Sequence, residues 1–169
     1  MVKSEYVFIV GLPRTGSKLA MNILRNSREG ICYSYETFFL GHLIRPGLRH
    51  KLKKFGDMSD DANVRKFVGY IYSSDKIDGN FWRFLRDGSL GVSRETFTQS
   101  LLDADRSTKE IYKTILKLNS QEGSSNAIRV DKSGSHLYHV PTLLEWFPDA
   151  KIIHTFRDPR AVLVSEHRR

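Results

Sequence analysis

The sequence predicts an α/β fold in which a central parallel sheet is flanked by helices on both faces, with a helical insertion. Short apolar runs alternate along the chain with longer segments of helical periodicity, which is typical of a parallel sheet. The first run, Tyr6–Val10, is apolar throughout, as a strand buried on both faces would be. A loop containing Gly16 then joins this strand to a helical segment that starts at Ser17.

The same patterns place the individual elements. We expect strands at Tyr6–Val10, Gly30–Tyr33, Ala127–Val130 and Lys151–Phe156. Apolar periodicity predicts helices over Ser17–Asn26, Asp61–Tyr72, Arg94–Leu101, Ala104–Asn119 and Leu137–Phe147. A further helix is predicted to begin at Asp158-Pro159, an N-cap acid followed by proline at the first helical position.

Residues 41–100 interrupt this alternation and are predicted to form a mixed insertion that contributes to an acceptor site. Its aromatic side chains Phe81, Trp82 and Phe84 are expected in the core. The length of 169 residues predicts a single domain over 1–169. The last helical segment, AVLVSEHRR, has neither a glycine cap nor a following proline, so we expect the domain to continue beyond it.

The charge, hydropathy and cysteine content indicate which partners and which cellular environment to expect. A net charge of +8, from 27 Lys and Arg against 19 Asp and Glu, favours anionic partners such as nucleic acid, a membrane surface or a phosphorylated small molecule. No apolar run is long enough to span a bilayer, and no signal-peptide pattern precedes the first strand. Cys32 is the only cysteine, which excludes an intrachain disulfide and favours a reducing, cytoplasmic environment.

The segment VFIVGLPRTGSKLA, residues 7–20, indicates an anion-binding site. A loop that leads from a strand into a helix can hold phosphate, because backbone N–H groups and the positive end of the helix dipole point at it. A nucleoside-triphosphatase P-loop would end in Gly-Lys-Ser/Thr, whereas the order here is Gly16-Ser17-Lys18. The loop therefore indicates a different phosphorylated ligand, and no cluster of His, Cys and Asp indicates a metal.

Two motifs resemble those of the sulfotransferases. GLPRTGSKL is similar to their 5′-phosphosulfate loop, usually Pro-Arg/Lys-Ser-Gly-Thr-Thr, and FPDAKIIHTFRDPRAVLVS is similar to the motif that binds the 3′-phosphate of the donor. In that family an arginine at a strand end is followed eight positions later by a serine, the spacing of Arg157 and Ser165 here. The resemblance implies a P-loop-like fold, 3′-phosphoadenosine 5′-phosphosulfate (PAPS) as donor, 3′-phosphoadenosine 5′-phosphate (PAP) as product, and no metal.

The resemblance also implies roles for individual residues. The 5′ end of the donor would be held by backbone N–H groups of Thr15, Gly16, Ser17 and Lys18. Arg14 would stabilise the charge that builds on the bridging oxygen as the sulfuryl group leaves, where many members place lysine. Arg157 and Ser165 would bind the 3′-phosphate. The alternatives are that Arg14 is a solvent-facing arginine and Ser165 an ordinary surface serine.

A general base and a second stabilising cation complete the predicted site. Glu36 lies 22 residues beyond Arg14, as in the sulfotransferases that use a glutamate base, such as bacterial and Golgi-type members; alternatively it begins a helix. Lys132, in DKSGSHLYHVP, resembles the lysine of their Glu/Asp-Lys-Ser/Thr-Pro element, with Gly134 in place of proline. Cytosolic members use a histidine base instead, for which His136 is the candidate here.

The sequence therefore predicts a sulfotransferase that acts on a small-molecule or carbohydrate acceptor, with no nucleic-acid partner. Two alternatives stay open. A P-loop nucleotide or small-molecule kinase would need Mg²⁺ and a lysine directly after Gly16, where Ser17 stands. A basic, non-enzymatic anion-binding module is favoured by the net charge of +8 and by the arginine-rich end HRR.

Overall fold

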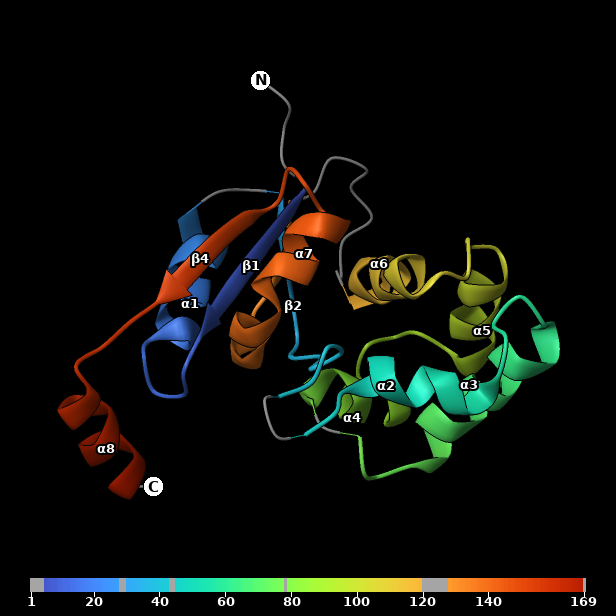
Figure 1. Ribbon diagram of the computed structural model, residues 1–169, viewed down its shortest axis with the longest axis horizontal. Helices are drawn as coiled ribbons and strands as arrows, with labels where there is room; N and C mark the ends of the chain where they lie inside the picture. Colours follow the sequence, from blue (N-terminus) through green and yellow to red (C-terminus); the bar gives the residue numbers. More distant parts are fainter. Residues whose placement is uncertain (1–4, 28–29, 43–44, 78, 120–127, 169) are drawn as a thin grey trace. The chain divides into compact units, whose positions relative to one another are not determined.

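The computed structural model describes residues 5–27, 30–42, 45–77, 79–119 and 128–168, which form two compact units. We call Met1–Tyr33 with Glu122–Arg169 the sheet unit, and Ser34–Gln121 the helical unit. Figure 1 draws both units and labels their α-helices and the strands β1, β2 and β4. Within the described residues, no helix has the length and apolar character needed to cross a membrane.

The four predicted strands are confirmed, and they form one sheet in the order β2-β3-β1-β4. Their bounds are β1 (Tyr6–Gly11), β2 (Ile31–Ser34), β3 (Ile128–Asp131) and β4 (Lys151–Thr155). β1 runs parallel to both neighbours, with Phe8 opposite Asp131 and Gly11 opposite Thr155. The carboxyl ends of β1, β3 and β4 consequently meet at one edge, and the predicted α/β class is confirmed.

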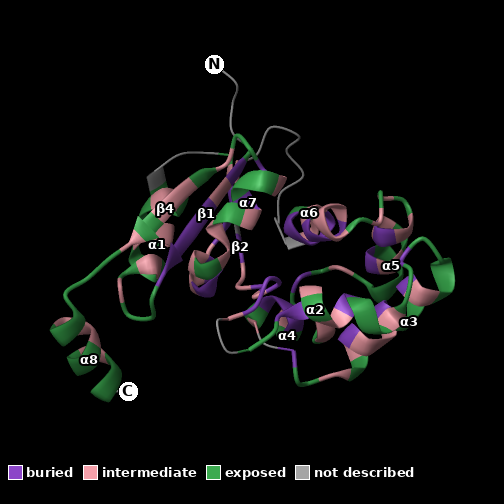
Figure 2. Ribbon diagram, viewed as in Figure 1, coloured by how far each residue is buried: buried purple, intermediate pink, exposed green. Residues whose placement is uncertain are grey.

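β1 is the centre of the sheet unit and is buried on both faces. Phe8 and Ile9, whose side chains point to opposite faces, are only 1% and 0% exposed. The ring of Phe147 packs on one face, 4.6 Å from the ring of Tyr6 and 5.3 Å from that of Phe8. Figure 2 shows β1 buried along its length, whereas the edge strand β4 is more exposed.

The helices of the sheet unit are α1 (Ser17–Ser27), the 3₁₀ helix η2 (Gly134–His139), α7 (Val140–Trp146) and α8 (Pro159–His167). The prediction of one helix over Leu137–Phe147 is wrong, because η2 and α7 share this segment. Pro141 has no N–H to donate to Leu137, so the α-helix starts anew with Pro141 in its first turn. The predicted start of α8 is confirmed, since Asp158 caps it by accepting from Arg160 N at 2.8 Å.

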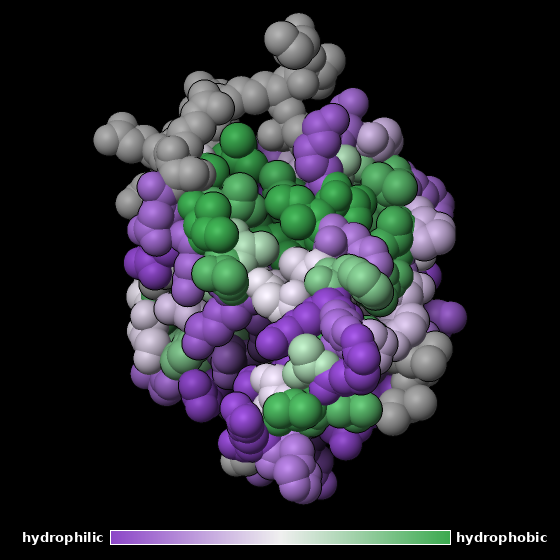
Figure 3. Space-filling view, turned by 90° about the vertical axis from the view of Figure 1, so that its left-hand side faces the viewer, coloured by the Kyte–Doolittle hydropathy of each residue, from purple (hydrophilic) through white to green (hydrophobic). Residues whose placement is uncertain are grey.

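Apolar side chains lie at the surface on the side of the sheet unit that carries β4, α1 and α8 (Figure 3). Among the described residues, β4 pairs only with β1, so its other edge is unpaired there. The large apolar side chains that are exposed in the described ranges all belong to this unit: Leu12, Leu19, Ile23, Tyr138, Leu144, Phe156, Leu163 and Val164. In the described part of the chain, β1 is therefore buried in the apolar core, whereas β4 beside it is only partly covered.

The helical unit contains α2 (Leu48–Leu52), the 3₁₀ helix η1 (Lys53–Phe55), α3 (Asp61–Ser73), α4 (Asn80–Arg86), α5 (Arg94–Leu102) and α6 (Thr108–Asn119). α3 and α5 match the sequence prediction to within a residue at each end, whereas α2 and α4 were not predicted. α6 starts at Thr108 and not at Ala104, because Ser107 accepts from Glu110 N and Asp105 accepts from Ser107 N. These side-chain bonds favour a turn before the helix begins.

Buried aromatic side chains form the core of the helical unit, as predicted for Phe81 and Trp82, which are both 0% exposed. The indole Nε1 of Trp82 donates to the carbonyl oxygen of Thr37 at 2.6 Å. The ring of Phe39 stacks on that of Tyr112, with the ring centroids 4.7 Å apart. Phe84 is half-buried and packs its ring against Tyr35.

We expect Trp82→Phe to lower the free energy of unfolding by about 2–4 kcal/mol. The change leaves a cavity and removes the indole N–H that donates to the carbonyl oxygen of the buried Thr37. Urea unfolding followed by circular dichroism measures the loss. Trp146→Phe is the matched control, because Trp146 is only half-buried and should lose less than Trp82. Equal losses for the two variants would contradict this account of the core.

Candidate functional site

The predicted phosphate loop, Leu12–Gly16, leaves β1 at a point with no room for a side chain. A Cβ on Gly11 would lie 2.6 Å from the carbonyl oxygen of Thr155 and 3.0 Å from Thr15 Oγ1. Thr15 Oγ1 donates to the Leu12 carbonyl oxygen at 2.7 Å and lies 2.8 Å from Thr155 Oγ1. The loop is thus held against the end of β4 at its start and its middle.

Arg14 lies in the left-handed region of backbone conformation, with φ 65°, which is uncommon for a residue other than glycine. Its Nε donates to Ser165 Oγ at 3.0 Å and is 3.7 Å from Glu166 Oε2. Arg157 Nη1 donates to the Arg14 carbonyl oxygen at 3.4 Å. The fold therefore brings Arg14 together with Arg157 and Ser165, which lie 143 and 151 positions further along the chain.

The start of α1 presents backbone donors beside Arg14. The first amides of a helix have no acceptor in a preceding turn, and the helix dipole is positive at this end. Ala20 N donates to the Gly16 carbonyl oxygen, so the helical bonds begin at Gly16, and no acidic residue stands in the first turn. With Ser17 half-buried and Lys18 exposed, this end of the helix suits an anion that approaches from solvent.

Gly134 brings the end of β3 to the same place. A Cβ on Gly134 would lie 2.7 Å from the Gly11 carbonyl oxygen, so no larger residue fits. Lys132 lies two residues earlier, directly after β3. It therefore belongs to the same short segment as Gly134, which packs against Gly11 at the end of β1.

Buried polar groups fix the backbone on either side of Lys132. Ser133 Oγ donates to Asp131 Oδ1 at 2.7 Å, and His136 N donates to the Ser133 carbonyl oxygen at 2.8 Å. His136 Nδ1 is 3.7 Å from Asp131 Oδ2. All three side chains are buried. His136 is thus enclosed beside Asp131, and its role as an alternative base stays a prediction.

Glu36 belongs to the helical unit and follows the end of β2 by two residues. The alternative in which it begins a helix is wrong, since residues 35–42 contain no helix. Its carbonyl oxygen accepts from Phe81 N at 3.2 Å, and its backbone leaves no room for a Cβ on Gly79. The backbone at Glu36 is therefore well supported, while its role as general base stays a prediction.

Thr155 and Glu166 are two residues of this site that the sequence analysis did not identify. Thr155 ends β4 and bonds to the phosphate loop, and Glu166 follows Ser165 on α8. A threonine at a strand end gives no distinct signal in one sequence, and Glu166 reads as a surface residue. Asp158, by contrast, caps α8, and the bonds from the side chain and N–H of Arg160 lower its pKa.

We expect Gly134→Ala to lower the free energy of unfolding by about 1–3 kcal/mol, because the methyl group would press on the backbone oxygen of Gly11. Urea unfolding measures the change. The matched control is Gly69→Ala within α3, where the nearest atom to an added Cβ is Arg94 Nη2 at 3.4 Å. That control should be neutral or gain up to about 1 kcal/mol from helix propensity. A Gly134 variant as stable as the parent would contradict the close approach.

Comparison with known proteins gives one result. A family model described as "Sulfotransferase family" matches residues 6–168, nearly the whole chain. The match covers the phosphate loop, the helical unit, Lys132, and the segment from Arg157 to Ser165. No curated protein and no solved structure matches the chain.

Proposed function

The chain belongs to the sulfotransferase family, and from this premise we propose that it transfers a sulfuryl group from PAPS to a hydroxyl or amine acceptor. The observation that carries the proposal is the meeting of Arg14, Arg157 and Ser165 at the carboxyl edge of the sheet. PAPS has anionic groups at both its 5′ and 3′ positions. Residues for both ends are present within one unit, on the loop after β1 and on the segment after β4.

The proposed roles follow from the chemistry of these groups. The N–H groups of Thr15, Gly16, Ser17 and Lys18 bind the 5′ end of the donor, supported by the dipole of α1. Arg14 contributes a guanidinium that suits phosphate and sulfate oxygens. Arg157 and Ser165 bind the 3′-phosphate. Because Arg14 and Glu166 are 43% and 50% exposed, the donor can reach this guanidinium without opening the core.

The reaction is an in-line displacement at sulfur. A bond forms between the acceptor oxygen or nitrogen and sulfur as the bond from sulfur to the 5′-phosphate oxygen breaks, and PAP leaves. Arg14 and Lys132 stabilise the negative charge that develops on the leaving oxygen. Glu36 takes the proton of the acceptor.

The acceptor and the location are also part of the proposal. We infer a small-molecule or carbohydrate acceptor, bound with the help of residues 41–100 of the helical unit, which also contains Glu36. A cytoplasmic location is supported by Cys32 being the only cysteine.

We expect PAP to raise the melting temperature of the chain by several degrees at about one hundred times its Kd, equivalent to about 2.7 kcal/mol. Arg14→Ala and Arg157→Ala should each weaken PAP binding by about tenfold or more, because each removes charge-assisted hydrogen bonds. Lys151→Ala is the matched control, since Lys151 is an exposed cation at the opposite end of β4. Thermal unfolding and calorimetric titration measure both effects.

The same experiment separates the alternatives. A shift that needs the 3′-phosphate and does not depend on Mg²⁺ supports the sulfotransferase proposal. A shift with ADP that requires Mg²⁺ would favour the kinase. Absence of any shift with PAP, from a folded protein, would contradict donor binding by this chain.

We expect Glu36→Gln to abolish sulfuryl transfer while PAP affinity stays within about twofold, because the amide cannot accept the proton but keeps the shape of the side chain. Transfer is followed with radiolabelled PAPS and a panel of hydroxyl and amine acceptors. A Glu36→Gln variant as active as the parent would instead assign the base to His136.

A further inference from the structure

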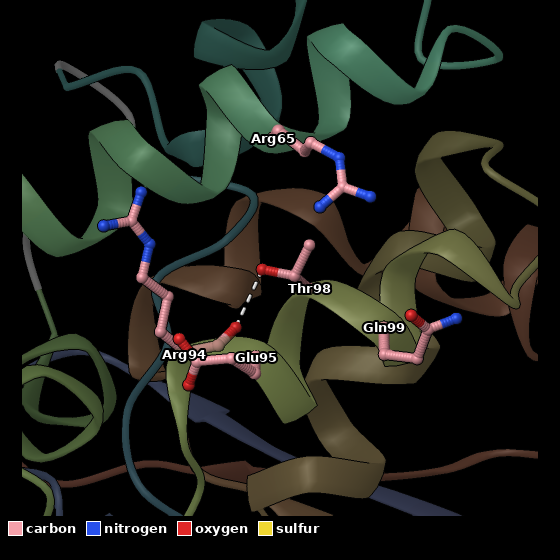
Figure 4. Close-up of a pocket in the computed structure, with 5 residues that line it drawn as sticks. All are labelled: Arg65, Arg94, Glu95, Thr98 and Gln99. Atoms are coloured by element: carbon pink, nitrogen blue, oxygen red, sulfur yellow. Dashed lines mark hydrogen bonds between the residues drawn. The ribbon is translucent and has the colours of Figure 1, made fainter.

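A pocket of about 400 Å³ lies in the helical unit, and none of its lining residues is one of the proposed donor-site residues. It is lined by Arg65, Arg94, Glu95, Thr98 and Gln99, from α3 and α5 (Figure 4). Its volume is within the range of small-molecule sites, which is about 300–1,000 Å³. None of these residues belongs to the two motifs, GLPRTGSKL and FPDAKIIHTFRDPRAVLVS, that resemble those of the sulfotransferases.

Two guanidinium groups enter this pocket from facing helices (Figure 4). Among the residues that the structure describes, neither Arg65 nor Arg94 forms an ion pair with a carboxylate. Arg94 is oriented by Tyr72, whose ring centroid lies 5.8 Å from the guanidinium carbon. It also lies over Gly69, where a Cβ would be 3.4 Å from Arg94 Nη2. The pocket therefore offers two cations, of which one is held in place by its surroundings.

The remaining lining residues each present a hydrogen-bond acceptor to the pocket. Gln99 Nε2 donates to Asp103 Oδ1 at 2.7 Å, which leaves the amide oxygen of Gln99 as an acceptor. Thr98 Oγ1 donates to the Arg94 carbonyl oxygen at 2.7 Å, so this hydroxyl also presents lone pairs. The Glu95 carboxylate adds a stronger acceptor. Glu95 also repels a ligand with several negative charges, so a single oxyanion with neighbouring hydroxyl groups fits best.

From this set of groups we propose that the pocket binds an acidic sugar, through one carboxylate or sulfate group on the sugar. Arg65 and Arg94 bind the oxyanion, since guanidinium groups match its oxygen atoms in pairs. Glu95 and Gln99 accept hydrogen bonds from the sugar hydroxyl groups. The proposal does not rest on sulfuryl transfer, because the pocket lies wholly within the helical unit.

The test is calorimetric titration of the full chain with glucuronate, with glucose 6-sulfate and with neutral glucose. We expect one or both anionic sugars to bind at least tenfold more tightly than glucose, and the better of the two identifies the oxyanion. Arg65→Gln and Arg94→Gln should each weaken that binding by about tenfold or more. Lys66→Gln is the matched control: it removes one charge from the next position of α3, outside the pocket, and should change the affinity less than twofold.

Binding of glucose as tight as that of glucuronate and of glucose 6-sulfate would overturn the proposal, as would no binding of either anionic sugar. Anionic-sugar affinity unchanged in the Arg65 and Arg94 variants would overturn it too. Circular dichroism and the shift in melting temperature with PAP show that each variant is folded. If the parent chain binds the acidic sugar but not PAP, the donor-site proposal fails and the pocket proposal stands. If it binds PAP but not the acidic sugar, the pocket proposal fails and the donor-site proposal stands.

Discussion

The absence of a side chain at Gly11 is the constraint on which the proposed donor site depends. Thr155 and Thr15 close the space on its Cα, and Gly134 approaches its carbonyl oxygen. At this one residue the ends of β1, β3 and β4 come into contact. Because the strands are parallel, the segments that follow them leave the same edge of the sheet. The phosphate loop, Lys132 and Arg157 are therefore brought near one another by backbone packing before any charge is considered.

Arg14 is held by contacts with the segment that follows β4. Its backbone conformation is unfavourable, which carries a strain of about 1–3 kcal/mol in proteins. Its carbonyl oxygen accepts from Arg157, and its guanidinium is bound to Ser165 with Glu166 close by. The Glu166 carboxylate thus partly neutralises Arg14 at the position where an anion would bind. Since both side chains are about half exposed, this ion pair is weak and can be exchanged for a ligand with more charge.

The sequence predicted the sheet better than it predicted the helices. Strands such as Tyr6–Gly11 are apolar runs bounded by turn residues, so both their identity and their ends are encoded locally. The division of residues 134–146 between η2 and α7 depends on Pro141 and on the buried bonds of Asp131 and Ser133, which apolar periodicity does not report. α2 and α4 are short, with five and seven residues, and are held by packing.

The residues of the candidate site also fall into two groups, those that the sequence predicted and those that it did not. Arg14, Arg157 and Ser165 were predicted because they occur in motifs with a fixed order, and the fold brings them together. Thr155 and Glu166 act through contacts between residues more than a hundred positions apart, which a single sequence cannot indicate. The Arg65–Arg94 pocket is similar, because its two cations face one another only after α3 and α5 have packed.

The two proposed anion sites differ in construction, and this difference predicts different ligands. The proposed donor site is built on a helix start with no acidic residue in its first turn, where backbone N–H groups and a dipole add to Arg14. Such a site gains from each additional negative charge and favours phosphate groups. The pocket between α3 and α5 uses side chains alone and includes Glu95. A nucleotide whose phosphate groups bound both arginines would also place negative charge close to the Glu95 carboxylate, which would repel it. A singly charged sugar would place hydroxyl groups there, and these can donate hydrogen bonds to the carboxylate. The proposed pocket would therefore favour a singly charged sugar over the more highly charged donor.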